Sequence, residues 1–172
     1  FTVESRGDAS AFAAARRTFP GYVHPAFDPA SGAEFGPGEF FWIAIRDADD
    51  IAGVVASRKF TGSIADLLHR RRFWGFDHPS IDDIAPFPIV APRHLCRVDG
   101  VLSFQGGLVL RRKLIRLRLT TPILHLVRLA SFRHWMEDWQ CAFYLRRTDP
   151  HGRRFGEWGY PNHAPLFEGR AG

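Results

Sequence analysis

Apolar side chains recur along the first half of the chain at two spacings, and each spacing predicts a different element. Residues 8–19 begin with an acidic residue, continue with an alanine-rich run and carry basic residues near their end. This pattern predicts an amphipathic helix. Residues 40–46 and 51–59 are instead rich in aromatic and β-branched side chains, and the short acidic turn between them predicts a β-hairpin. Apolar residues return to helical spacing over residues 61–72, where we expect a second helix.

The second half begins with a strong hairpin signal. Residues 93–98 and 101–110 flank the dipeptide Asp99-Gly100, which suits a tight turn between antiparallel strands. We therefore expect a second hairpin here, with residues 101–110 as the central strand of the sheet.

A helix and a strand are expected to follow. Thr120 can cap the helix, and Pro122 then falls in its first turn, where a missing N–H is tolerated. The apolar positions of this helix that should face the core are Ile123, Leu124, Leu126, Val127 and Ala130. Residues 140–145 read as a further buried strand, so a strand, a helix and a strand follow one another.

The fold class predicted from this order is α/β, more precisely a mixed α+β arrangement. A strand–helix–strand unit within an otherwise antiparallel set implies a mixed, mostly antiparallel twisted sheet flanked by helices, with a right-handed crossover. Pro and Gly deny regular structure to residues 20–38 and residues 77–92, which we expect to be long loops. A length of 172 residues with 45% hydrophobic content suits one domain over residues 1–172.

Composition and charge limit the classes of partner and the cellular location that the sequence predicts. The sequence has no run of about 18 apolar residues, so we expect no membrane span. It begins at Phe1 without an initiator Met, which suggests processing or trimming, and without a secretory signal pattern a cytoplasmic location is the expectation. The net charge of +5 points toward anionic partners, but no nucleic-acid-binding motif is present, so a nucleic-acid partner is disfavoured.

Metal and nucleophile motifs are missing from the sequence. Its two cysteines, Cys96 and Cys141, cannot build a disulfide framework and are expected to be small buried residues. None of the eight histidines is spaced with Asp, Glu or Cys as metal ligands are, so no metal is predicted.

Three local sequences, taken in their order along the chain, resemble those of a known family. Residues 51–55 (IAGVV) follow the acidic turn, residues 103–110 (SFQGGLVL) precede a basic stretch and a helix, and residues 154–160 (RFGEWGY) lie near the end. In this order they resemble the GNAT superfamily of acetyl-CoA-dependent N-acetyltransferases, over roughly residues 40–166.

The resemblance implies a GNAT-like acyltransferase domain that binds acetyl-CoA or another acyl-CoA. Such enzymes hold the pyrophosphate with backbone N–H groups of a glycine turn at a helix start. That turn falls on residues 115–119, where Arg116 and Arg118 stand in place of both glycines. The cofactor-binding residues that the resemblance implies are Leu108, Val109, Leu110, Arg111, Arg112, Lys113, Arg116, Arg118 and Thr120.

Catalysis by such a domain would move an acyl group to an amine, either a small molecule or a peptide. The tyrosine that often acts as the acid in this family falls on Phe155, and Tyr160 is the nearby candidate for that role. Candidate bases are Glu39 and Asp50 beside the first hairpin, and His94 ahead of the central strand.

Two other functions remain open from the sequence. A catalytically degenerate GNAT-like domain could bind another anion or a protein partner, and the lost glycines favour this alternative. The aromatic residues of the segment 73–76, together with Trp135 and Trp139, could then belong to an interface. A homodimer is compatible with the sequence, and the Arg-rich stretch leaves nucleic-acid binding as the third alternative.

Overall fold

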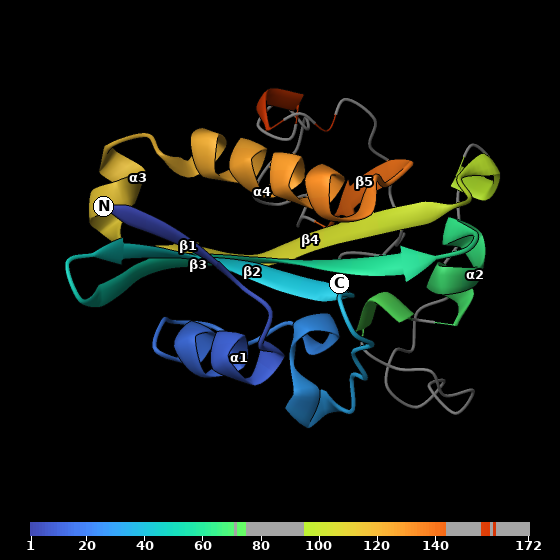
Figure 1. The fold of residues 1–172 in the computed structure, drawn as a ribbon, viewed down its shortest axis with the longest axis horizontal. Coiled ribbons are helices and arrows are strands. Elements are labelled where there is room, and N and C mark those ends of the chain that lie inside the picture. Colours follow the sequence, from blue (N-terminus) through green and yellow to red (C-terminus); the bar gives the residue numbers. More distant parts are fainter. Residues whose placement is uncertain (71, 75–94, 144–155, 159, 161–172) are drawn as a thin grey trace, which may run out of the picture.

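The fold is a mixed α/β arrangement, as the sequence predicts. The computed structural model describes residues 1–70, 72–74, 95–143, 156–158 and 160. Their strands form a five-stranded sheet in the order β1-β2-β3-β4-β5, with α1 against one face and α4 against the other (Figure 1). The strands are β1 (Thr2–Arg6), β2 (Phe40–Asp47), β3 (Asp50–Thr61), β4 (Val101–Leu110) and β5 (Trp139–Ala142).

The helices connect and cover these strands. The α-helices are α1 (Ala9–Arg17), α2 (Ile64–His69), α3 (Arg112–Arg116) and α4 (Thr120–Trp135). Short 3-10 helices are η1 (Pro25–Phe27), η2 (Pro29–Ser31), η3 (Arg72–Trp74) and η5 (Leu95–Arg97). None of the helices that the structure describes is long and apolar enough to cross a membrane.

Strand direction confirms the predicted mixed sheet. The pairs from β1 to β4 are antiparallel, whereas β5 returns parallel to β4 after α3 and α4. The sequence did not predict β1, which pairs along the edge of β2 with Val3 opposite Ile45. Because four of the five β1 residues are exposed, the strand lacks the apolar alternation that would have revealed it.

The first two helices and the first hairpin follow local rules. The Asp8 carboxylate caps α1 by accepting hydrogen bonds from the N–H groups of Ser10 and Ala11, at 2.8 and 3.1 Å. The hydroxyl of Ser63 caps α2 in the same way, so that helix starts later than the predicted residue 61, which belongs to β3. The predicted hairpin is confirmed as β2 and β3, joined through Ala48, whose φ is 55°.

The second predicted hairpin is wrong in its first arm. Leu95–Arg97 forms the 3-10 helix η5 instead of a strand, and residues 93 and 94 lie outside the described residues. The carbonyl of Val98 accepts a hydrogen bond from the N–H of Ile64, which holds this segment beside α2. The edge of β4 that a hairpin partner would need is taken by β5.

Helix α4 covers the second face of the sheet, but its start differs from the prediction. Leu119 is the N-cap and provides no side-chain hydrogen bond, so Thr120 is the first helical residue and does not cap. Pro122 lies in the first turn as predicted. The predicted core position Leu126 is wrong, because 39% of this residue is exposed. The other predicted positions are buried or half-buried, namely Ile123, Leu124, Val127 and Ala130.

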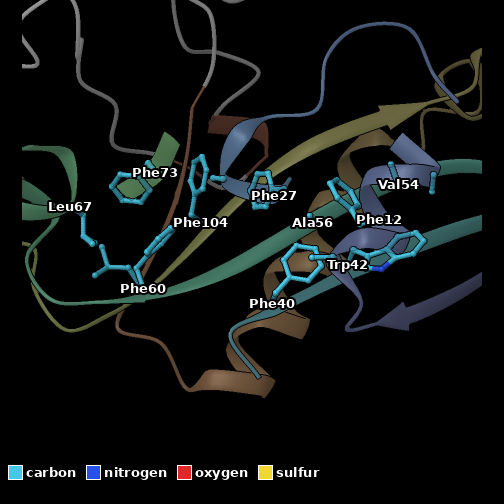
Figure 2. Close-up of a cluster of buried hydrophobic side chains, with 14 of the residues drawn as sticks. Phe12, Phe27, Phe40, Trp42, Val54, Ala56, Phe60, Leu67, Phe73 and Phe104 are labelled. Carbon is cyan, nitrogen blue, oxygen red and sulfur yellow. The ribbon is translucent and has the colours of Figure 1, made fainter. Parts of the chain in front are cut away.

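Two hydrophobic clusters fill the two faces of the sheet. Seven of the 17 buried residues of the cluster on the α1 face are aromatic, and Figure 2 shows Phe12, Phe27 and Phe104 gathered between α1, the loop after it and the sheet. The cluster on the α4 face is mostly aliphatic and includes Val55 and Leu124. Each face of β4 therefore packs against a different core.

The loop between α1 and β2 is fixed by a buried cation. Arg58 of β3 is 4% exposed, and its Nη1 donates to the carbonyl of Ala26 at 2.9 Å while Nη2 donates to the carbonyl of Glu34. Its guanidinium also lies over the rings of Phe35 and Phe60. The predicted loop is thus held firmly against the α1 face of the sheet.

Candidate functional site

β4 contains a bulge just beyond its described pairing with β5. Val54 pairs with Val109 and Ala56 with Gly106, so Val55 alone faces both Gly107 and Leu108. Gly107 has a φ of 64°, as in bulges that place a glycine in the left-handed region. The pairing between β4 and β5 ends at Gln105 and Ala142, just before this bulge.

A cavity of about 350 Å³ lies beside this bulge. Its apolar walls come from both faces of the sheet and include Val55, Leu108, Leu124, Phe104, Phe143 and Trp158. Its polar lining comprises Arg16, Tyr22, His24, Gln105 and Tyr160. A volume of this size lies near the lower end of the roughly 300–1,000 Å³ typical of small-molecule sites.

Tyr160 lies in this cavity with its proton retained. The residue is 7% exposed, and its hydroxyl donates a hydrogen bond to Oε1 of Gln105. The guanidinium of Arg128 lies over the Tyr160 ring, with 5.0 Å from Cζ to the ring centroid. Burial raises the pKa of Tyr160 above its ordinary value, although the charge of Arg128 opposes this shift. The phenol is therefore an acid that remains protonated at neutral pH.

His24 contributes a neutral imidazole to the same cavity. Its Nδ1 accepts a hydrogen bond from the N–H of Ala26 at 3.2 Å, so the proton of the neutral ring lies on Nε2. Burial lowers the pKa of His24 to about 4. Among the described residues Nε2 has no hydrogen-bond partner, which leaves it available as a donor to a ligand.

A second hollow continues along β4 beyond the bulge. It has a volume of about 780 Å³, and the end of α1, the turn of the first hairpin and the residues after β4 line it. Its cationic lining consists of Arg111, Arg112 and Lys113. Arg111 pairs with Asp50 at 3.2 Å and Lys113 with Asp47 at 2.5 Å, whereas Arg112 forms no ion pair with any described residue.

The segment expected to act as a phosphate-binding turn is folded on itself. Residues 112–116 form α3, and Arg118 follows with a φ of 56°, the conformation that a glycine would adopt more easily. The N–H groups of Leu117, Arg118 and Leu119 donate to the carbonyls of Lys113, Ile115 and Leu114. These three amides are therefore not available to a phosphate. A phosphate bound beside this turn would be contacted by cationic side chains instead.

Six of the nine implied cofactor residues line one of the two hollows. Leu108 lines the cavity at the bulge. The second hollow is lined by Val109, Leu110, Arg111, Arg112 and Lys113. Arg116 and Arg118 are exposed and Thr120 is half-buried, and these three residues line neither hollow.

Among the candidate catalytic residues that the structure describes, Tyr160 alone lines the cavity. Glu39 lines neither hollow, and its carboxylate accepts a hydrogen bond from the N–H of Gly36 at 2.9 Å within its own loop. Asp50 is paired with Arg111, as described above. His94 and Phe155 lie outside the described residues.

Sequence reasoning gave no site role to four of the five polar residues of the cavity, namely Arg16, Tyr22, His24 and Gln105. A signal existed for Arg16, because it lies four residues after Phe12 and so on the buried face of α1. No comparable signal exists for His24, which lies in a loop rich in Pro and Gly.

No group of three or more His, Cys, Asp or Glu residues within the described ranges is arranged to hold a metal ion. No family model, curated protein or solved structure matches the chain.

Proposed function

We propose that the protein is an N-acyltransferase that moves an acetyl or other acyl group from CoA to an amine. The observation that carries this proposal is the cavity at the β4 bulge, which contains a buried, protonated tyrosine and is followed along the same strand by a cationic hollow. The arrangement could accommodate the two ends of an acyl-CoA, with the acyl end at the bulge and the phosphates near Arg112.

The residues of the cavity suit the proton transfers of this reaction. Acyl-CoA would supply the acyl group as a thioester. An ammonium acceptor first loses one proton to water, because no carboxylate is present among the described residues that line the cavity. Tyr160 would donate its proton to the sulfur as the amine nitrogen bonds to the acyl carbon and the carbon–sulfur bond breaks. The second proton released by the nitrogen returns to the tyrosinate through water.

His24 supports the same step as a hydrogen-bond donor. A neutral imidazole with its proton on Nε2 can donate to a carbonyl oxygen on which negative charge develops, without the desolvation cost of a buried cation. Because Nδ1 is already occupied by the N–H of Ala26, His24 is not the base in this proposal.

The experiment that tests the proposal is isothermal titration of the protein with acetyl-CoA and with CoA. Micromolar binding that weakens in Arg112→Ala would support a cofactor held by cationic side chains. Arg116→Ala/Arg118→Ala is the matched variant, since these exposed arginines lie outside the hollow and should change affinity less. No binding at millimolar acetyl-CoA would exclude the acyltransferase.

A non-catalytic GNAT-like protein is the second candidate, and one observation favours it. The amides of residues 117–119 are used within the turn, where a pyrophosphate-binding loop would leave its amides unpaired. In that case neither acetyl-CoA nor CoA would bind, and the cationic hollow would serve a different anion.

A further inference from the structure

Arg16 is a cation buried in the wall of the cavity. It lies in the last turn of α1, and only 9% of the residue is exposed. Its neighbour Arg17 points elsewhere, is exposed and pairs with Asp28 at 2.6 Å. Two adjacent arginines of one helix therefore differ in environment, and only Arg16 lines the cavity.

The guanidinium of Arg16 is poorly satisfied within the described protein. Nη1 donates to the carbonyl of Pro20 at 3.0 Å, whereas Nε is buried and has no hydrogen-bond partner. No carboxylate of the described residues pairs with Arg16, and burial is the main cause that lowers its pKa. A buried charge without a counter-ion is unfavourable, so an anion that pairs with this guanidinium would relieve that cost.

The rest of the cavity restricts what that anion can be. Arg16 is the one charged side chain among the described residues that line it, and aromatic and aliphatic groups form most of the remaining wall. A volume of about 350 Å³ suits a small molecule rather than a long chain. The cavity therefore favours a ligand with one anionic group and an apolar body.

We infer that this cavity binds the carboxylate of an apolar α-amino acid, with Arg16 as its counter-ion. The inference rests on the proposed function in one respect, namely that the amino group of this ligand is the acyl acceptor. The carboxylate would accept hydrogen bonds from the guanidinium, whose planar donors match its geometry. The apolar side chain would contact the wall formed by Phe104, Phe143 and Leu108.

The test compares ligands that differ in one group. The intact protein, without CoA, is titrated with L-phenylalanine, with 3-phenylpropionate and with L-phenylalaninamide, which keeps the ring and the amine but lacks the carboxylate. We expect both carboxylates to bind roughly tenfold to hundredfold more tightly than the amide, as the loss of a charge-assisted hydrogen bond implies. Equal binding of phenylalanine and its amide would overturn the inference.

Two variants separate a binding role of Arg16 from a structural one. Arg16→Gln should fold with unchanged or higher thermal stability, because it removes an uncompensated buried charge, and should lose the preference for carboxylates. Arg17→Gln is the matched control and should bind as the unchanged protein does. Retained carboxylate preference in Arg16→Gln would contradict the inference, as would equal losses in both variants.

Titrations with inorganic phosphate and with acetyl-CoA distinguish failure of the amino-acid inference from failure of the acyltransferase proposal. If phosphate displaces 3-phenylpropionate and Arg16→Gln loses acetyl-CoA binding, then Arg16 serves a phosphate of the cofactor and the amino-acid inference is wrong. If the carboxylates bind through Arg16 while acetyl-CoA does not bind, the ligand class is supported and the acyltransferase fails. If acetyl-CoA binds and the carboxylates show no preference, the acyltransferase survives and the amino-acid inference fails.

Discussion

The ring of Phe27 stacks on the ring of Phe104, with 5.3 Å between their centroids and 10° between their planes. Phe27 belongs to the loop that carries His24, and Phe104 belongs to β4 just before the bulge. The stack therefore ties the loop side of the cavity to its strand side. A Cβ atom at Gly106 would lie 2.6 Å from Cε2 of Phe27, so the stack depends on a glycine at this position.

We predict that Gly106→Ala destabilises the protein by roughly 1–3 kcal/mol, as overpacking of a core typically does. Urea denaturation measures this change. Gly7→Ala is the control, because its Cβ would meet no atom closer than the carbonyl oxygen of Phe40 at 3.9 Å. Equal stability of Gly106→Ala and the unchanged protein would show that Phe27 can move away, and would weaken the account of the cavity wall.

The stability of the protein should depend on pH through His24. Its pKa is about 4 in the folded protein and near 6.5 when the chain is unfolded, so between these values the unfolded state binds a proton that the folded state does not. Stability is therefore complete above about pH 6.5 and falls as the pH drops toward 4, by up to about 1.4 kcal/mol per pH unit. Urea denaturation at several pH values measures the slope.

His24→Gln provides the comparison for this slope. Glutamine can still accept the hydrogen bond from Ala26 but does not titrate, so the contribution of His24 to the slope should disappear. An unchanged slope between pH 4 and 6.5 would mean that His24 is not held neutral in the folded protein.

A buried hydroxyl pair links β3 to α4, and its two members should differ in importance. Ser131 donates to the carbonyl of Val127 at 2.9 Å, so Ser57 is the donor in the 2.7 Å hydrogen bond between the two hydroxyls. Ser131→Ala leaves the Ser57 hydroxyl without its acceptor, which costs about 1–3 kcal/mol, and Ser57→Ala should cost less. Thermal denaturation of both variants checks this order, and the reverse order would contradict the assignment of the donor.

The proposed function predicts a specific effect at Tyr160. Tyr160→Phe removes the proton donor but keeps the ring beneath Arg128, so kcat should fall roughly 10²- to 10⁴-fold. The variant also leaves the buried Oε1 of Gln105 without the donor Tyr160, so its stability should fall by about 1–3 kcal/mol and the assay is run well below its thermal midpoint. Once an amine acceptor has been identified, a steady-state assay of thiol release measures kcat. Tyr22→Phe is the matched control, since Tyr22 also lines the cavity but is 75% exposed. Full activity of Tyr160→Phe would remove the tyrosine from the reaction.

Local signals in the sequence predicted most of the fold. The first helix, the first hairpin and the central strand follow from capping, alternation and turn residues close to them in the chain. The failures arose where a distant partner decides the outcome. Asp99-Gly100 indicated a hairpin, yet the carboxylate of Asp138 accepts a hydrogen bond from the N–H of Val101, and β5 takes the edge of β4. Such long-range competition leaves no local trace.

The site was predictable only in part for a similar reason. Tyr160 and Leu108 could be inferred from a resemblance, and both line the cavity. The spacing of Arg16, four residues after Phe12, indicates the buried face of α1. That Arg16 also lines a cavity follows only from the packing of α1 on the sheet.

The short parallel pairing of β5 makes this strand the least firmly held in the sheet. Within the described residues β5 pairs with β4 only over Leu102–Gln105, whereas β3 pairs with β4 from Gly53 to Thr61. A pairing this short opens before the rest of the sheet does. The chain could therefore populate a species with an intact four-stranded sheet and no cavity, in which hydrogen exchange would be rapid at Gln140 and Cys141 and slow at Val54 and Val55.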